Sequence, residues 1–122
     1  MKVYLAGPIN GATDAECNDW RAEATRVLQD VLNPMLRDYR GREGHHSKEL
    51  VLADKQDIMA CDAVLAYCPK PSVGTSMEVL FAWMNHIRVV AVVPDVERAS
   101  PWLREHAELV SSLGEALAML GG

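Results

Sequence analysis

Short apolar runs alternate with segments of helical period along this chain, and this alternation restricts the fold more than any other feature. The clearest runs are Val3–Ala6, Ala63–Tyr67 and residues 89–93, and the segments between them carry apolar residues three or four positions apart. Parallel strands are joined by crossovers of about a dozen residues or more, which are usually helices. The pattern therefore predicts an α/β fold, in which a mainly parallel sheet with right-handed crossovers carries helices on both faces.

Capping signals and helical period set the expected helices. Thr13 and Glu16 match a capping box in front of a first helix whose apolar positions run from Cys17 to Val31. We expect Ser47 to cap a second helix, and Ser100 followed by Pro101 to start a fourth. The third and fifth expected helices cover residues 75–86 and 112–120, short strands are expected at residues 33–36 and 109–110, and residues 37–46 are expected to form a surface loop.

The bulk composition excludes several classes of protein. A chain of 122 residues is about the size of one domain, so we expect residues 1–122 to form a single domain. Its net charge of -5 offers no overall attraction to nucleic acid or to acidic membranes, and neither is expected as a partner. No apolar stretch approaches the roughly 20 residues of a membrane span, and the first residues are too few for a signal peptide. We therefore expect a cytoplasmic protein.

The cysteines and histidines do not indicate a metal site or a disulfide framework. Cys17, Cys61 and Cys68 are odd in number and lack C-x-x-C spacing, which favours buried thiols. His45 and His46 are adjacent, so their side chains point in different directions, and no further ligand follows at metal-site spacing. We expect no cofactor and no metal.

Glu78 follows a loop of small residues after the run Ala63–Tyr67, at the start of the third expected helix. Thr75 and Glu78 match a capping box, in which the glutamate only bonds the backbone of its own helix. The same position lies at the carboxyl end of a strand, where α/β proteins bind their ligands, and a carboxylate there can attack an electrophilic carbon. The local pattern leaves both interpretations open.

Asp54 and Asp57 lie three residues apart on the second expected helix, so they share roughly one face. Two solvated charges would explain them. Alternatively, one of them approaches the site and, beside a second carboxylate, keeps a raised pKa and serves as a proton donor. Asp62 is expected at the amino end of the next strand, away from such a site.

The end of the first strand and the loop after residue 36 supply further candidates for ligand contact. The turn after the first strand permits close approach of the backbone to a ligand because it contains glycine. The later loop offers guanidinium groups and a ring to a base or a phosphate. The candidates are Tyr4, Gly7, Pro8, Ile9 and Asn10 in the first group, and Arg37, Asp38, Tyr39 and Arg40 in the second.

Hydroxyl side chains gather near the expected start of the third helix. Ser72, Thr75 and Ser76, with Gly74 among them, suit a phosphate or a sugar hydroxyl at a helix N-terminus. Capping and turn formation explain these residues equally well. The larger apolar residues Trp83, Met84 and Trp102 are expected in the core.

Three motifs, taken together, resemble the nucleoside 2-deoxyribosyltransferase superfamily, which includes the 2'-deoxynucleoside 5'-monophosphate N-glycosidases. The first motif is Tyr4-Leu5-Ala6-Gly7-Pro8-Ile9. The second places Asp54 four residues before Ile58 and continues through Cys61 and Asp62 into Ala63-Val64-Leu65-Ala66, and the third is Gly74-Thr75-Ser76-Met77-Glu78. The resemblance spans nearly the whole chain.

The resemblance implies a flavodoxin-like, doubly wound sheet of about five strands, a homodimer or larger homo-oligomer, and a role in nucleotide salvage. It implies that Glu78 is the nucleophile that attacks the anomeric carbon of a deoxyribose as the base departs. Asp54 would assist base departure, Tyr4 would orient the nucleophile, and residues 7–11 would line the sugar. Asp57 is kept as a second contact that could share the role of Asp54.

The motif Pro71-Ser72-x-Gly74-x-x-x-Glu78 is similar to that of the monophosphate N-glycosidases, in which the equivalent serine contacts the 5'-phosphate. The first loop instead carries Pro8 and Asn10, where that branch favours serine and arginine. Nucleoside and 5'-monophosphate therefore both remain open as substrates, as do a base or water as acceptor. The alternatives outside this reaction are a NAD or nucleotide glycohydrolase and a nucleotide-binding module without turnover.

Overall fold

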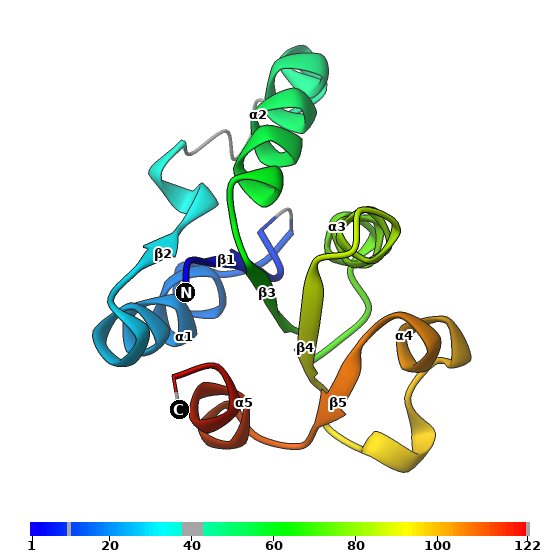
Figure 1. The fold of residues 1–122 in the computed structure, drawn as a ribbon. Coiled ribbons are helices and arrows are strands. Elements are labelled where there is room, and N and C mark those ends of the chain that lie inside the picture. Colours follow the sequence, from blue (N-terminus) through cyan, green and yellow to red (C-terminus); the bar gives the residue numbers. More distant parts are fainter. Residues whose placement is uncertain (10, 38–42, 122) are drawn as a thin grey trace.

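A computed structural model describes residues 1–9, 11–37 and 43–121 of the chain. Its centre is a five-stranded sheet in the order β2-β1-β3-β4-β5 (Figure 1). All four neighbouring pairs are parallel. The predicted α/β class and flavodoxin-like strand order are therefore confirmed. The strands are β1 (Val3–Ala6), β2 (Val31–Leu32), β3 (Ala63–Tyr67), β4 (Arg88–Val92) and β5 (Glu108–Val110).

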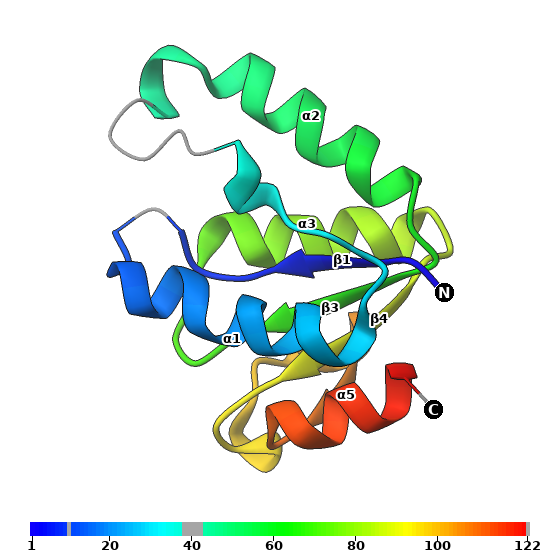
Figure 2. The same cartoon turned by 90° about the vertical axis from the view of Figure 1, so that its left-hand side faces the viewer.

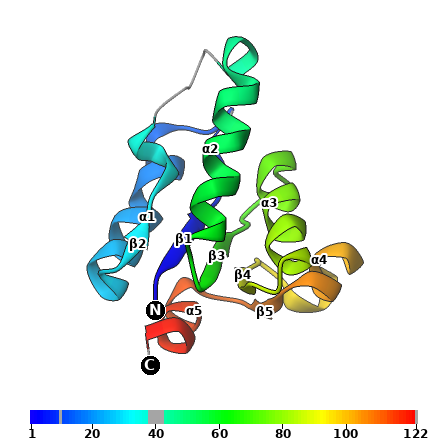
Figure 3. The ribbon, with the colours of Figure 1, turned by 45° about the horizontal axis from the view of Figure 1, so that its top comes forward.

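Helices cover both faces of this sheet. The helices are α1 (Asp14–Leu28), α2 (Ser47–Met59), α3 (Val73–Met84), α4 (Pro101–His106) and α5 (Leu113–Gly121). Helices α1 and α5 lie against one face, and α2, α3 and α4 lie on the other (Figures 1 and 2). On this second face α2 and α3 are neighbours (Figure 3).

Alternation along β1 divides its side chains between two hydrophobic clusters. Val3 and Leu5 join the cluster beneath α1 and α5, whereas Tyr4 and Ala6 join the cluster beneath α2 and α3. Side chains of a strand point to opposite faces in turn, so this split follows directly from the sequence. It places the Tyr4 ring on the face that also receives Glu78 and Asp54.

The region between α1 and the second strand differs from expectation. The first helix ends at Leu28, because Gln29 adopts a positive φ of 67°. Val31, expected on the helix, forms β2 with Leu32. Residues 33–36 were expected as a strand, but Pro34–Leu36 is a 3₁₀ helix capped by the Asn33 side chain, which accepts from the Met35 backbone N–H at 2.9 Å. Pro34 has no N–H for a sheet ladder and fits the first helical turn.

Two helix starts also differ from expectation. Ser47 is the first residue of α2 rather than its cap, and the cap position is His46, whose side chain makes no capping bond. Helix α3 begins at Val73, two residues before the expected start, because Ser72 is its cap.

Within the expected loop at residues 37–46, Glu43–His45 forms a 3₁₀ helix. Asn10, Asp38, Tyr39 and Arg40 lie outside the described residues.

The prediction that Trp83, Met84 and Trp102 belong to the core is wrong. Their exposed fractions are 51%, 64% and 73%. They lie on the outward sides of α3 and α4, where the His106 ring packs edge-on to Trp83 and parallel to Trp102. The apolar character of a residue does not by itself decide whether its side chain faces the core. On α3 the small residue Ala82 faces the sheet instead of the larger apolar residues.

The cysteine prediction is confirmed in most respects. Cys17 and Cys61 are buried and Cys68 is half-buried, and all three are free thiols.

None of the helices in the described part of the chain is both long and apolar enough to span a membrane.

Gly7 offers a test of how tightly α1 packs against the end of β1. A β-carbon at Gly7 would lie 2.5 Å from Cζ2 of Trp20, and that ring is held in a stack with Tyr67 at 5.1 Å between centroids. Gly7→Ala should therefore destabilise the protein by about 1–3 kcal/mol, as overpacking does. Urea unfolding measures this. The control is Gly114→Ala, where the nearest atom would be 4.0 Å away; equal stabilities of the two variants would contradict the packing argument.

Candidate active site

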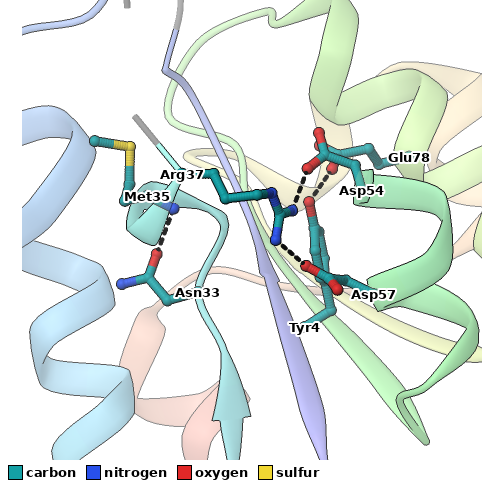
Figure 4. A network of polar contacts seen from close by, with 7 residues as sticks. All are labelled: Tyr4, Asn33, Met35, Arg37, Asp54, Asp57 and Glu78. Atoms are coloured by element: carbon teal, nitrogen blue, oxygen red, sulfur yellow. Dashed lines mark hydrogen bonds and ion pairs between the residues drawn. The ribbon is translucent and has the colours of Figure 1, made fainter. Parts of the chain in front are cut away.

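A hydrogen bond between Tyr4 and Glu78 lies at the centre of the candidate site (Figure 4). The Tyr4 hydroxyl donates to Oε2 of Glu78 at 2.5 Å. Tyr4 is fully buried on β1, and Glu78 is part-buried on the second turn of α3. The contact spans the point between β1 and β3 at which the strand order reverses, which is the usual ligand position in open α/β sheets.

Glu78 is not the capping residue that the pattern Thr75-x-x-Glu78 allowed. Ser72 caps α3 instead, because its Oγ accepts from the Thr75 backbone N–H at 3.4 Å and lies 2.9 Å from Oγ1 of Thr75. Thr75 is buried inside the helix. The Glu78 carboxylate is therefore directed at Tyr4 rather than at its own helix N-terminus.

Arg37 joins the two aspartates of α2, as Figure 4 shows. Its Nη2 lies 2.9 Å from Oδ1 of Asp54, and its Nη1 lies 2.7 Å from Oδ2 of Asp57. The guanidinium follows the 3₁₀ helix Pro34–Leu36 at the end of β2, so β2 and α2 meet through this bridge. The structure thus brings together Tyr4, Asp54, Asp57, Arg37 and Glu78 from four separate segments.

Burial shifts the acidity of the central pair. It raises the pKa of Glu78 to about 7, and the nearby charge of Asp54 adds to this, whereas the hydrogen bond from Tyr4 and the positive charge of Arg21 oppose it. Burial, followed by the charge of Glu78, raises the pKa of Tyr4 far above its usual value. Tyr4 therefore remains a protonated donor while the carboxyl of Glu78 changes its charge near neutral pH.

Asp54 has a raised pKa although it is bonded to arginine. Burial is the main cause, and the hydrogen bond and charge of Arg37 oppose it. Partial burial alone would lower the pKa of Arg37, but its hydrogen bonds to Asp57 and Asp54 raise it. Two carboxyl groups on adjacent helices thus have pKa values above those they would have in water. This arrangement is expected of an acid and a nucleophile in one site.

The first turn of α3 brings together the hydroxyls that the sequence suggested for phosphate. Ser76 Oγ donates to the Ser72 carbonyl at 2.8 Å, and the Ser72 hydroxyl is engaged by Thr75. Gly74 is exposed, with no atom within 4 Å of where a β-carbon would lie. Within the described residues, no acceptor is recorded for the backbone N–H groups of Val73 and Gly74. These groups point out of a helix N-terminus, which favours anions.

A cavity of about 620 Å³ adjoins this turn on the side away from Tyr4. Loops after β3 and β4 line it together with α3 and α4, and its wall includes Ser72, Thr75 and Ser76. Tyr4, Asp54 and Glu78 are not among its lining residues. We place the candidate site at the carboxyl groups rather than in this cavity, because hydrogen bonding and charge bring Tyr4, Asp54 and Glu78 together there.

The turn after β1 forms the edge of the site, and it is held by a residue that the sequence did not suggest. Gly7 and Pro8 are buried and Ile9 is half-buried. Arg21, 1% exposed on α1, donates to the carbonyls of Gly7 and Pro8 at 3.1 and 3.4 Å. The available signal was an arginine within the otherwise apolar stripe of α1, next to Trp20 and three residues before Ala24.

Other candidates lie elsewhere. Asp62 is at the amino end of β3, as expected, where its carboxylate accepts from the Lys2 backbone N–H at 2.8 Å. His46 lies 3.0 Å from Glu49 on the surface. In the parts of the chain that the structure describes, no group of three or more His, Cys, Asp or Glu side chains is arranged to hold a metal ion.

Comparison with known protein families identifies the family of this chain. The family model described as nucleoside 2-deoxyribosyltransferase matches residues 3–117. The chain belongs to that family. It is therefore an enzyme of the nucleoside deoxyribosyltransferase kind, and its substrates are of the nucleoside class. No curated protein sequence matches this family member significantly.

Solved structures share the fold of this family member. A 2-deoxyribosyltransferase from Bacillus psychrosaccharolyticus has a TM-score of 0.77 at 16% identity, covering 98% of this chain and 96% of its own. A conserved protein from Enterococcus faecalis has a TM-score of 0.75 at 19% identity, with coverages of 98% and 96%. The CMP N-glycosidase of Clostridium botulinum has a TM-score of 0.65 at 18% identity, with coverages of 98% and 97%.

The raised pKa of Glu78 predicts a pH-dependent loss of stability. The pKa of Glu78 is about 7 in the folded state, against 4.5 for a free glutamate. Between these values the folded state binds more protons than the unfolded state, so stability falls as pH rises through that window. Glu78→Gln lacks this titration and should gain up to roughly 3 kcal/mol on the wild type between pH 4.5 and 7.5.

Urea unfolding of both proteins across this pH range measures the difference. Glu23→Gln, an exposed position on α1, is the matched control, for which the difference should stay flat with pH. If the stability difference between Glu78→Gln and the wild type also stays constant with pH, the Glu78 carboxyl is not desolvated in the folded state.

Proposed function

We propose that this protein cleaves the N-glycosidic bond of a 2'-deoxyribonucleoside or its 5'-monophosphate, with Glu78 as the nucleophile. The deoxyribosyl group then passes to another base or to water. The observation that carries the proposal is the Tyr4–Glu78 hydrogen bond at the strand-order switch point, with Asp54 close to it. Family membership supports the type of reaction.

Tyr4 supports a nucleophilic role for Glu78 by holding one oxygen of the carboxylate. Its hydrogen bond to Oε2 fixes the carboxylate and leaves Oε1 to form the new bond. In the first step Oε1 bonds to C1' of the sugar, the bond between C1' and the base nitrogen breaks, and the base leaves with that electron pair. This is the first half of a retaining glycosidase reaction.

In the second step an acceptor attacks C1' from the face that the base has left. A water molecule or a base nitrogen bonds to C1', the bond to Oε1 breaks, and Glu78 recovers its carboxylate. The attacking water or base N–H passes its proton to Asp54, which gave its own proton to the leaving base in the first step. Water gives the free sugar, whereas a base gives a new nucleoside. The overall exchange needs no oxidant, reductant or metal.

Asp54 supports the departure of the base. Its raised pKa suits a group that can hold a proton and donate it to the leaving base. Arg37 bridges Asp54 to Asp57 and so fixes the side chain at the mouth of the site. Asp57 acts through this bridge, since it shares the guanidinium with Asp54.

The N-terminus of α3 supports binding of the sugar 5'-end. The backbone N–H groups of Val73 and Gly74 and the hydroxyl of Ser72 offer donors to either a 5'-hydroxyl or a 5'-phosphate, and Ser76 lies beside them. The glycine at position 74 leaves the approach to this turn open. Gly7, Pro8 and Ile9 border the site on its opposite side and would contact the sugar.

Removal of the nucleophile is the direct test. Glu78→Gln keeps an acceptor for Tyr4 but cannot form the glycosyl ester, so kcat should fall by about 10³-fold or more. Base release is followed by chromatography with a panel of deoxyribonucleosides, their 5'-monophosphates, the matching ribonucleotides and NAD. Glu23→Gln should keep wild-type turnover. Undiminished base release by Glu78→Gln would refute the proposal, and release of nicotinamide alone would assign a different substrate.

Ser72 separates the two substrate classes. Ser72→Ala removes the hydroxyl at the α3 N-terminus, and if that hydroxyl contacts a 5'-phosphate, kcat/KM for monophosphates should fall by about tenfold, the worth of one hydrogen bond to a charged group. The value for nucleosides should change much less. Because the variant also loses a helix cap worth about 1 kcal/mol, Ser72→Gly, which costs the helix less, is the control. Equal losses for both substrates would assign Ser72 to capping alone.

A further inference from the structure

Arg21 is a buried cation that the proposed reaction does not use directly. Its side chain is 1% exposed and lies between α1 and the turn after β1. Nη1 donates to the carbonyl of Cys17 at 2.6 Å and to that of Pro8 at 3.4 Å, and Nη2 donates to the carbonyl of Gly7 at 3.1 Å. The guanidinium thus ties the first turns of α1 to the two residues that follow β1.

This arrangement is costly for a residue that only fills space. Burying a charge costs several kcal/mol unless it is paired and fully hydrogen-bonded. Among the described residues no carboxylate lies within ion-pair distance of Arg21, and its buried Nε has no hydrogen-bond partner. An apolar side chain would fit the apolar stripe of α1 without this cost. The guanidinium therefore calls for an explanation beyond stability.

The position of Arg21 relates it to the candidate site. Helix α1 runs back along β1 on the face opposite to α2 and α3 (Figure 2). From that face the arginine reaches the carboxyl end of β1, three residues beyond Tyr4. The Gly7 and Pro8 carbonyls accept from it, so the guanidinium is tied to the end of the strand that carries Tyr4.

Burial and three ionisable groups set the charge of Glu78. Burial raises the pKa of Glu78, the Tyr4 hydroxyl on β1 lowers it by hydrogen bonding, Asp54 on α2 raises it, and Arg21 on α1 lowers it. The effect is mutual, since burial lowers the pKa of Arg21 while Cys17, followed by Glu78, Tyr4 and Asp54, opposes that change. Arg37 is engaged with Asp54 and Asp57. Arg21 is therefore the cation that offsets Asp54 at the nucleophile.

We propose that Arg21 is a positioning residue: its guanidinium holds the turn at Gly7 and Pro8 at the edge of the site and places a buried positive charge beside that turn. The inference rests on the proposed role of Glu78 as nucleophile. Being buried behind the turn, Arg21 does not touch the substrate and acts through these two carbonyls and through its charge. The turn in the correct place orients the sugar, and an ionised Glu78 is the form that can attack C1'.

The first test measures the ionisation of Glu78 without turnover. Arg21→Met keeps the length of the side chain and removes its charge and donors. The carboxyl of Glu78, followed by ¹³C NMR, should then titrate at higher pH than in the wild type, by roughly 0.5 pH unit or more. An unchanged titration in the folded variant overturns the electrostatic part. This readout stands even if Glu78→Gln proves active and the proposed function fails.

The second test separates charge from geometry in the kinetics. For Arg21→Met the acid limb of the kcat/KM profile should move to higher pH. The loss of kcat/KM relative to the wild type should therefore be largest at low pH and smaller at high pH. Arg21→Lys keeps the charge but lacks the planar fork, so its acid limb should stay near that of the wild type while KM rises severalfold. An Arg21→Lys enzyme with wild-type KM and kcat overturns the positioning part.

Loss of folding would be recognised by circular dichroism and thermal melting. If Arg21→Met does not fold, Arg21→Gln replaces it, because the neutral amide can still donate to one carbonyl. A uniform loss of activity at every pH, with an unmoved Glu78 titration, would assign Arg21 a purely structural role. If neither neutral variant folds, the KM of Arg21→Lys alone tests the positioning role. A severalfold rise in KM supports that role, and a wild-type KM overturns it.

Discussion

The hydrogen bond from Tyr4 to Glu78 is the contact on which the candidate site depends. Tyr4 belongs to a central strand and to a fully buried cluster, so its hydroxyl is placed by the hydrophobic core and not by a loop. A carboxylate bonded to it is equally fixed. This is how a nucleophile can be preorganised without a metal: one rigid donor holds one oxygen, and burial keeps water from competing for the other.

Charges of both signs surround this contact from opposite faces of the sheet. Arg37 pairs with Asp54 and Asp57 on the face that carries α2, whereas Arg21 is bonded to the turn at Gly7 from the face that carries α1. Neither arginine is bonded to Glu78. The carboxylate thus remains available for chemistry, while its ionisation responds to burial, to one hydroxyl and to charges from two helices.

The sequence predicted the layered sheet, because apolar period is a local property that the parallel topology preserves. It grouped Tyr4, Asp54 and Glu78 only through the resemblance to a known family. It did not predict the cap of α3. Ser72 and Thr75 are both capping residues by type, and only the extended backbone of Ser72 decides between them. Arg21 was missed because hydrophobic period assigns arginine to the surface, and its burial depends on carbonyls contributed by another segment.

The three tryptophans of the chain differ in a way that makes one of them an optical reporter. Trp20 is buried, touches Gly7 and lies 4.7 Å beneath the Arg21 guanidinium, whereas Trp83 and Trp102 are exposed beside His106. With the two exposed rings replaced by phenylalanine, the remaining indole emission would come from beneath the turn after β1. The protein thus carries its own fluorophore at the edge of the site, where ligand entry and any movement of that turn could be followed without an added label.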